Sequence, residues 1–89
     1  MKIIIQPTAK KNLKKLPNSV REIILKKLFS IKDNPLPHIE KLKESALWKL
    51  RVGDYRCILF VHTGKEEVHI LTVGHRKNIY KNLRKSESG

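Results

Sequence analysis

Cationic side chains that could bind phosphate alternate along the middle of the chain. Within residues 47–52, Lys49 and Arg51 would share one face of an extended strand, and apolar side chains would share the other. Arg56, in the next expected strand, has the spacing to join Lys49 on the same face. Such a face favours a polyanion, because lysine and arginine hold phosphate by charge and hydrogen bonds. An ordinary polar strand face remains the alternative.

A second group of candidates follows the last expected strand, where His75 precedes Arg76. An imidazole titrates near neutral pH and can exchange a proton, although a histidine that is only hydrogen-bonded at a strand end would look the same. If Arg76 converges with Lys49 and Arg56 on one sheet edge, the three cations form a site. Alternation along strands does not show whether they converge.

The remaining histidines, His38, His62 and His69, are expected to be structural or exposed. No pair of them has a recognised metal-ligand spacing, and the acidic residues are few and scattered. We therefore expect no metal and no other cofactor.

The chain as a whole is strongly basic. Its 89 residues include 20 lysines and arginines against eight aspartates and glutamates, a formal net charge of +12, and 39% are hydrophobic. A charge of this sign attracts polyanions such as RNA or DNA, and a merely solvated basic surface is the alternative. The length suits a single domain over residues 1–89 with one hydrophobic core.

The expected cellular compartment follows from cysteine and apolar content. Cys57 is the only cysteine, so no disulfide can form within the chain and a reducing environment is expected. The three isoleucines after Lys2 are too few for a signal peptide, and no apolar run is long enough to span a bilayer. These features predict a soluble cytoplasmic protein without a membrane partner.

The first half of the chain predicts one strand and two helices. An isoleucine-rich strand covers residues 2–6 and ends at Pro7, and the short helix that follows is stopped by Pro17. A longer helix comes next and ends before residues 33–37, DNPLP. Its expected buried positions are Val20, Ile23, Ile24, Leu28 and Ile31. The short connection predicts an antiparallel helical hairpin.

The second half alternates with a period of two. Strands expected over residues 47–52, 55–62 and 66–74 are joined by tight turns and form an antiparallel meander. The basic residues 76–85 predict a short final helix. The fold class is therefore α+β: an N-terminal strand, an antiparallel helical hairpin packed on one face of a four-stranded, mainly antiparallel sheet, and a short basic C-terminal helix.

The sheet face without helices carries an apolar strip next to the cations. Ile58 and Phe60 have the same parity as Arg56 along their strand. An exposed strip of this kind requires a cover. The cover is either the chain's own C-terminal segment, in which Ile79 and Leu83 are at helical spacing, or another protein.

Two motifs give the chain a resemblance to a known family. The sequence LWKLRVGDYR at residues 47–56 is followed by VGHR at residues 73–76 and then by Tyr80. Together with a first strand that ends in Pro-Thr and two lysine-rich helices, these motifs closely resemble the RelE/ParE toxin superfamily over essentially the whole chain. The overall pattern is similar to archaeal RelE members, which implies a RelE-like fold.

The resemblance implies a RelE-type toxin of a type II toxin-antitoxin system. Such a toxin is a ribosome-dependent endoribonuclease that inhibits translation by cleaving mRNA without a metal. In the family, the 2′-hydroxyl attacks the adjacent phosphate and leaves a 2′,3′-cyclic phosphate and a 5′-hydroxyl end. The implied partners are a cognate RelB-like antitoxin, the ribosome and mRNA. The expected antitoxin contacts are Ile58, Phe60, Ile79 and Leu83.

The family's catalytic residues match four positions of this chain. Lys49 matches a strand lysine that holds phosphate, and Arg56 matches an arginine that stabilises the transition state. Arg76 matches an arginine near the leaving group, and Tyr80 matches a tyrosine that orients the target nucleotide. Leu47 replaces a second catalytic lysine of the family, so another group would have to compensate in proton transfer. The supporting candidates are Arg51 and His75.

Two other functions remain open. A ParE-like DNA gyrase poison would have the same fold and no RNA chemistry of its own, and the joint presence of the four matched residues argues against it. A non-catalytic basic RNA- or ribosome-binding module is the other possibility. Beyond Tyr80 and Phe60, the chain offers few aromatic residues for base stacking, which argues against a binder of free single strands.

Overall fold

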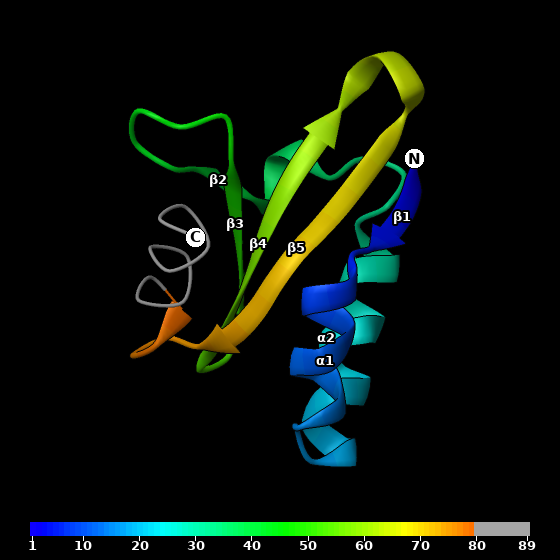
Figure 1. The fold of residues 1–89 in the computed structure, drawn as a ribbon. Coiled ribbons are helices and arrows are strands. Elements are labelled where there is room, and N and C mark those ends of the chain that lie inside the picture. The colour runs from blue at the N-terminus through cyan, green and yellow to red at the C-terminus, as the bar shows by residue number, and fades with distance from the viewer. Residues whose placement is uncertain (80–89) are drawn as a thin grey trace.

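The computed structural model of the protein describes residues 1–79, in which two helices lie side by side on one side of a sheet (Figure 1). The elements in chain order are β1 (Lys2–Ile5), α1 (Pro7–Lys14), α2 (Asn18–Ser30), a 3-10 turn (Leu36–His38), β2 (Glu40–Lys41), β3 (Trp48–Val52), β4 (Tyr55–His62), a second 3-10 turn (Thr63–Lys65) and β5 (Glu67–His75). The predicted α+β class with a helical hairpin on one sheet face is confirmed. Within residues 1–79, no helix is both long and apolar enough to cross a membrane.

The sheet formed by the described residues has five strands in the order β1-β5-β4-β3-β2. β1 runs parallel to β5, and the other neighbouring strands are antiparallel. The expected number of four strands was wrong, because β2 adds an edge strand that pairs Glu40 with Lys49 and Lys41 with Trp48. A strand of two residues is too short to produce an alternating pattern in the sequence.

The predicted basic helix over residues 76–85 falls mostly outside the described part of the chain. Tyr80 and Leu83 lie outside it as well. After β5 the chain makes a turn in which the N–H of Asn78 donates to the carbonyl of His75 at 2.9 Å. Ile79, the last described residue, is fully buried.

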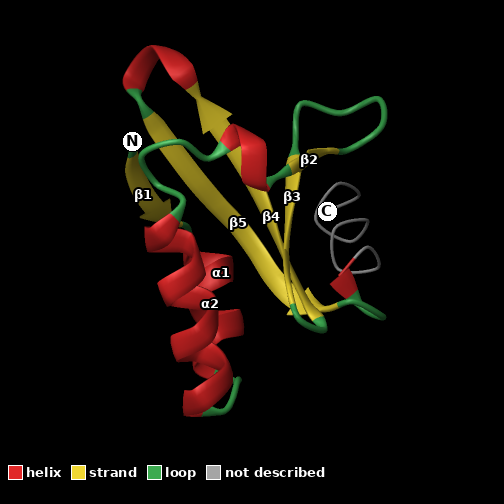
Figure 2. Ribbon diagram, turned by 180° about the vertical axis from the view of Figure 1, so that it is seen from behind, coloured by secondary structure: helices red, strands yellow, loops and turns green. Residues whose placement is uncertain are grey.

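The helices face one side of the sheet (Figure 2), and buried residues from both layers make up the main core. Ile24 and Leu28 of α2 have no exposed surface. β3 and β4 contribute alternate residues, among them Leu50, Cys57 and Leu59. This alternation agrees with the predicted faces of both strands. Full burial of each large apolar side chain contributes about 1.5–3 kcal/mol to stability.

One expected core position of α2 is wrong. Ile23 is 59% exposed, whereas Ile24, Leu28 and Ile31 are buried. These three recur at helical spacing and share one face of the helix. Ile23 precedes Ile24 by one residue, or about 100° of rotation, so its side chain stands at the edge of that face.

A polar contact joins α1 to β5. Oδ1 of Asn12 accepts hydrogen bonds from the hydroxyl of Thr72 at 2.9 Å and from the N–H of Val73 at 3.0 Å. Thr72 is only 5% exposed, so its hydroxyl is shielded from water. The single amide oxygen of Asn12 therefore satisfies two donors that burial would otherwise leave unpaired.

A β-bulge interrupts the regular pairing of β5. Ile58 pairs with Thr72 and Leu59 pairs with Ile70, which leaves Leu71 as an extra residue. An insertion of one residue reverses the side-chain alternation beyond it. His69 and His75 are an even number of residues apart, yet the bulge puts them on opposite faces.

Candidate functional site

The cations predicted on the open sheet face line a single pocket of about 260 Å³. Its lining residues are His38, Glu40, Lys49, Arg51 and Arg56, and we call it the cationic pocket. The three cations come from β3 and β4, as strand alternation predicted. His38 and Glu40 come from the first 3-10 turn and β2, which sequence reasoning did not associate with a site. The only hint in the sequence was their position just after the residues 33–37 that end α2.

Arg51 and Arg56 occupy directly opposite positions in the β3–β4 ladder. Directly opposed side chains share a face with Cβ atoms about 4.5–5.5 Å apart, and like charges at this spacing are destabilising. Lys49, opposite Ile58, adds a third cation two residues earlier on β3. The local positive potential is therefore high, and a bound phosphate would lower it.

Lys49 and Glu40 form an ion pair within the pocket. Nζ of Lys49 lies 3.1 Å from Oε2 of Glu40, and the two side chains are 23% and 76% exposed. β2 brings Glu40 directly opposite Lys49. A pair with so exposed an acid contributes at most about 1 kcal/mol. Glu40 therefore orients the ammonium group but leaves the pocket positive.

The turn between β3 and β4 holds the guanidinium of Arg56. Nη1 donates to the carbonyl oxygens of Gly53 and Tyr55, both at 2.9 Å. Gly53 has a φ of 58°, a left-handed conformation that glycine adopts without steric cost. A guanidinium has five N–H donors, so Arg56 keeps donors for an anion after making these two bonds.

Arg76 and His75 lie outside the cationic pocket. The N–H of Arg76 donates to the Asp54 carbonyl at 2.8 Å, and its Nε lies 4.0 Å from Oδ1 of Asp54. The ring of His75 packs edge-on against Tyr55, with centroids 5.6 Å apart. Tyr55 packs against the main core, so the bulge has turned His75 toward the helices. The structure thus gathers three predicted cations and leaves these two residues outside.

The expected apolar strip beside the cations is only partly present. Ile58 has no exposed surface, so its predicted exposure was wrong, whereas Phe60 is partly exposed. Ile58 and Ile79 are both fully buried, yet neither belongs to the main core. Ile58 is therefore covered on the open face. The alternation along one strand predicts which face a side chain occupies but not whether that face is covered.

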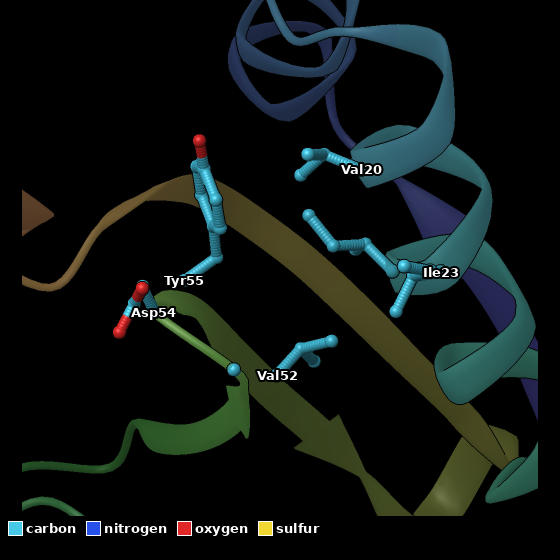
Figure 3. Close-up of a pocket in the computed structure, with 7 residues that line it drawn as sticks. Val20, Ile23, Val52, Asp54 and Tyr55 are labelled. Atoms are coloured by element: carbon cyan, nitrogen blue, oxygen red, sulfur yellow. The ribbon is translucent and has the colours of Figure 1, made fainter.

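A second pocket of about 160 Å³ lies between α2 and the β3–β4 turn. Figure 3 shows Val20 and Ile23 of α2 on one side, with Val52 and Tyr55 across from them. Asp54 supplies the charged group of this lining, which is otherwise mainly apolar. No cation lines this pocket to bind a phosphate, so phosphate binding belongs to the cationic pocket.

The thiol of Cys57 has low reactivity in the folded protein. Cys57 is fully buried, and this burial raises the pKa of its thiol to about 12. A thiol that stays protonated at neutral pH is a poor nucleophile and a poor metal ligand. Across residues 1–79, no three histidine, cysteine, aspartate or glutamate side chains are grouped to hold a metal. The reactive groups are therefore those of the cationic pocket rather than the thiol.

Comparison of the sequence with family models identifies the class of protein. The model for the ParE toxin of type II toxin-antitoxin systems, parDE, matches residues 3–80. The chain therefore belongs to this family, within the RelE/ParE superfamily, and it is a toxin of a type II toxin-antitoxin system. The resemblance carried by the two sequence motifs is confirmed. A search of curated protein sequences finds no match.

Solved structures of toxin-antitoxin complexes share this fold. The RelBE2 complex of Mycobacterium tuberculosis matches with 25% identity and a TM-score of 0.79, covering 83% of this chain and 95% of that chain. The archaeal RelE-RelB complex of Pyrococcus horikoshii has 26% identity, a TM-score of 0.73 and coverages of 84% and 93%. The intact RelBE complex of Escherichia coli has 29% identity, a TM-score of 0.70 and coverages of 83% and 94%. The predicted RelE-like fold is thus confirmed.

Proposed function

We propose that this toxin is a ribosome-dependent endoribonuclease that cleaves mRNA and thereby inhibits translation. The observation that carries the proposal is the cationic pocket, in which Lys49, Arg51 and Arg56 surround one space on the open sheet face. Three cations and one carboxylate leave a net positive site for a phosphodiester, and arginine can hold two phosphate oxygens at once. The likeness to RelE-containing toxin-antitoxin complexes supports a toxin of the RelE type.

The proposed reaction is attack of an RNA 2′-oxygen on the adjacent phosphorus. The new bond closes a 2′,3′-cyclic phosphate, the bond from phosphorus to the 5′-oxygen breaks, and that oxygen takes up a proton from water. Negative charge grows on the phosphoryl oxygens in the transition state, where fixed cations act most strongly. We assign Arg56 to stabilise this charge, Lys49 to hold the phosphate and Arg51 to support it.

The 2′-hydroxyl proton needs an acceptor. Leu47 stands where the family pattern has a second catalytic lysine. Glu40 and His38 line the pocket, and a carboxylate or an imidazole can act as a general base. We therefore assign the proton transfer to these two side chains and not to His75, whose ring packs against Tyr55 outside the pocket.

Arg76 and Tyr80 complete the proposed set on the strength of the family motif. We assign Arg76 to the leaving 5′-oxygen. Its side chain is 55% exposed and contacts Asp54 only at 4.0 Å, so it can turn toward a bound substrate. Tyr80 lies outside the described residues, and its proposed role is to orient the target nucleotide.

We propose a cognate RelB-like antitoxin as the inhibiting partner. The similar solved structures are toxin-antitoxin complexes. A net charge of +12 favours an acidic partner segment, which would place carboxylates against the cationic pocket. Of the expected contacts, Ile58 and Ile79 are buried. Phe60 is partly exposed, and Leu83 lies outside the described residues.

Primer extension on a message translated with and without the protein tests the proposed activity. We expect new 5′ ends in the translated region, with 2′,3′-cyclic phosphate and 5′-hydroxyl groups at the cut. Products with a 3′-hydroxyl and a 5′-phosphate would overturn the mechanism. Binding to ribosomes without cleavage would instead support a non-catalytic RNA- or ribosome-binding module.

A DNA gyrase poison is the second candidate, because the matching family model is that of ParE toxins. A gyrase poison needs no phosphodiester chemistry of its own, so the cationic pocket would be dispensable for it. Purified toxin should then inhibit DNA supercoiling by gyrase and leave translated mRNA intact. If Arg56→Ala no longer inhibits gyrase, the cationic pocket is required for that inhibition.

A further inference from the structure

Three aromatic rings gather on the open sheet face beside the cationic pocket. Phe60 lies edge-on to His62, with ring centroids 6.0 Å apart and planes at 82°. It also meets His69 at 6.4 Å and 69°, and these two residues are directly opposite in the β4–β5 ladder. All three side chains are partly exposed. We call them the aromatic cluster.

Two hydrogen bonds fix the ring of His69. Nε2 of Gln6 donates to Nδ1 of His69 at 2.8 Å, and Nε2–H of His69 donates to Oε1 of Glu67 at 3.0 Å. The hydrogen bond from His69 holds the pKa of Glu67 below its usual value. The carboxylate is therefore charged and able to accept at neutral pH. A ring held in this way is already ordered before a ligand arrives, which lowers the entropic cost of binding.

The aromatic cluster and the cationic pocket share strand β4. Phe60 follows Arg56 by four residues, which corresponds to about 13 Å along a strand. Both side chains alternate with the core residues Cys57 and Leu59 and so stand on the open face. A ligand lying along β4 can therefore contact cations at one end and aromatic rings at the other.

We propose that the aromatic cluster is a stacking site for a base of single-stranded RNA, and that the phosphate of a nearby nucleotide in the same strand occupies the cationic pocket. The inference rests on the proposed function, because it concerns the same substrate. Every base offers a flat π-surface, and stacking on an aromatic side chain strengthens binding about 5- to 100-fold per base. Phe60 supplies the ring for stacking, and the two histidines frame it.

The surroundings of Phe60 favour a base over an apolar protein segment. Ile58, its neighbour on the same face of β4, is fully buried, so this part of the described face offers no continuous apolar stripe for an amphipathic helix. Glu67 and Gln6 place an acceptor and a donor next to the rings, as the polar edge of a base requires. The Glu67 carboxylate also repels phosphate, so the RNA backbone belongs at the pocket end.

The test compares Phe60→Leu with Phe60→Trp in the full chain. Leucine keeps an apolar side chain without a π-surface, and tryptophan keeps the π-surface. Fluorescence anisotropy measures binding of a labelled single-stranded RNA hexamer and of an abasic hexamer with the same phosphates. We expect Phe60→Leu to bind the RNA hexamer about 5- to 100-fold more weakly than the parent. Phe60→Trp should bind like the parent, and neither change should affect the abasic hexamer.

Phe29→Leu is the matched control, because Phe29 is 53% exposed on α2. Thermal unfolding of each variant checks that the fold is kept. If the parent protein bound the RNA hexamer and the abasic hexamer with equal affinity, the bases would not contribute to binding and the inference would be overturned. The inference would also be overturned if Phe60→Leu bound the RNA hexamer as tightly as the parent, or if it lost the same affinity for the abasic hexamer. A base-dependent loss in a toxin that cleaves no translated mRNA would overturn the proposed function and support this site.

Discussion

Arg51 and Arg56 stand directly opposite each other across β3 and β4, on the sheet face that the helices leave open. Like charges at directly opposite positions repel each other and lower the stability of the strand pair. Glu40, the carboxylate of the pocket, contacts Lys49 instead. The arginine pair therefore carries an electrostatic cost that a bound phosphate would relieve.

Arg51→Gln should stabilise the protein by about 0.2–1 kcal/mol in dilute buffer without phosphate, because the substitution removes that repulsion. Urea unfolding measures the change. Added sulfate should stabilise the parent more than this variant, since the anion screens the arginine pair. Lys26→Gln, on the exposed face of α2, is the control and should show neither effect. If Arg51→Gln is less stable than the parent, Arg51 and Arg56 do not repel each other enough to lower stability.

Arg56→Ala should lower the single-turnover rate of cleavage on ribosome-bound mRNA by about 10²-fold or more, the usual loss for a transition-state charge stabiliser. The measurement is a quenched time course with saturating toxin. Lys26→Ala removes the same charge from an exposed position on α2 and should change the rate little. Equal losses in both variants would mean that total charge, not the pocket, determines activity.

Asn12→Ala should lower the free energy of unfolding by about 2 kcal/mol, because it leaves the Thr72 hydroxyl and the Val73 N–H without their acceptor. Chemical denaturation gives the value. Asn12→Asp keeps an oxygen at the same position and should cost much less. If the two variants are equally destabilised, the loss comes from the amide group itself and not from the two accepted bonds.

Cys57 should react with thiol reagents at neutral pH only when the chain opens, because the folded thiol is buried and protonated. Its pKa rises from 9.0 to about 12 on folding. Above pH 9 the unfolded thiol ionises and the folded thiol does not, so stability falls as pH rises toward 12. Urea unfolding across this range should show a smaller fall in Cys57→Val. Rapid labelling of the native protein would show that the thiol is accessible.

Local patterns were sufficient for the part of the site that lies on regular strands. The period of two put Lys49, Arg51 and Arg56 on one face, and the tight turn between them fixed which residues pair. The same reasoning separated the core positions Leu50 and Cys57 from that face. Both results depend only on neighbours in sequence, which is why they could be predicted.

The remaining features of the site depend on contacts that a linear pattern does not record. Glu40 reaches the pocket through a strand of two residues that pairs with β3, and two residues are too few to produce an alternating pattern. His75 changes face because Leu71 is an extra residue in β5, and nothing in its residue type marks a bulge. Ile58 is buried by packing on the open face, which alternation treats as exposed.

The parallel pairing of β1 with β5 has a consequence for the order of folding. Lys2 pairs with Glu67, so this contact closes a loop that contains both helices and three strands. Contacts so distant in sequence slow folding, whereas a hairpin such as β3–β4 forms within microseconds. We therefore expect the two opposed arginines to meet early and β1 to dock last. On a chain emerging from the ribosome, the phosphate-binding surface would be assembled before the sheet is complete.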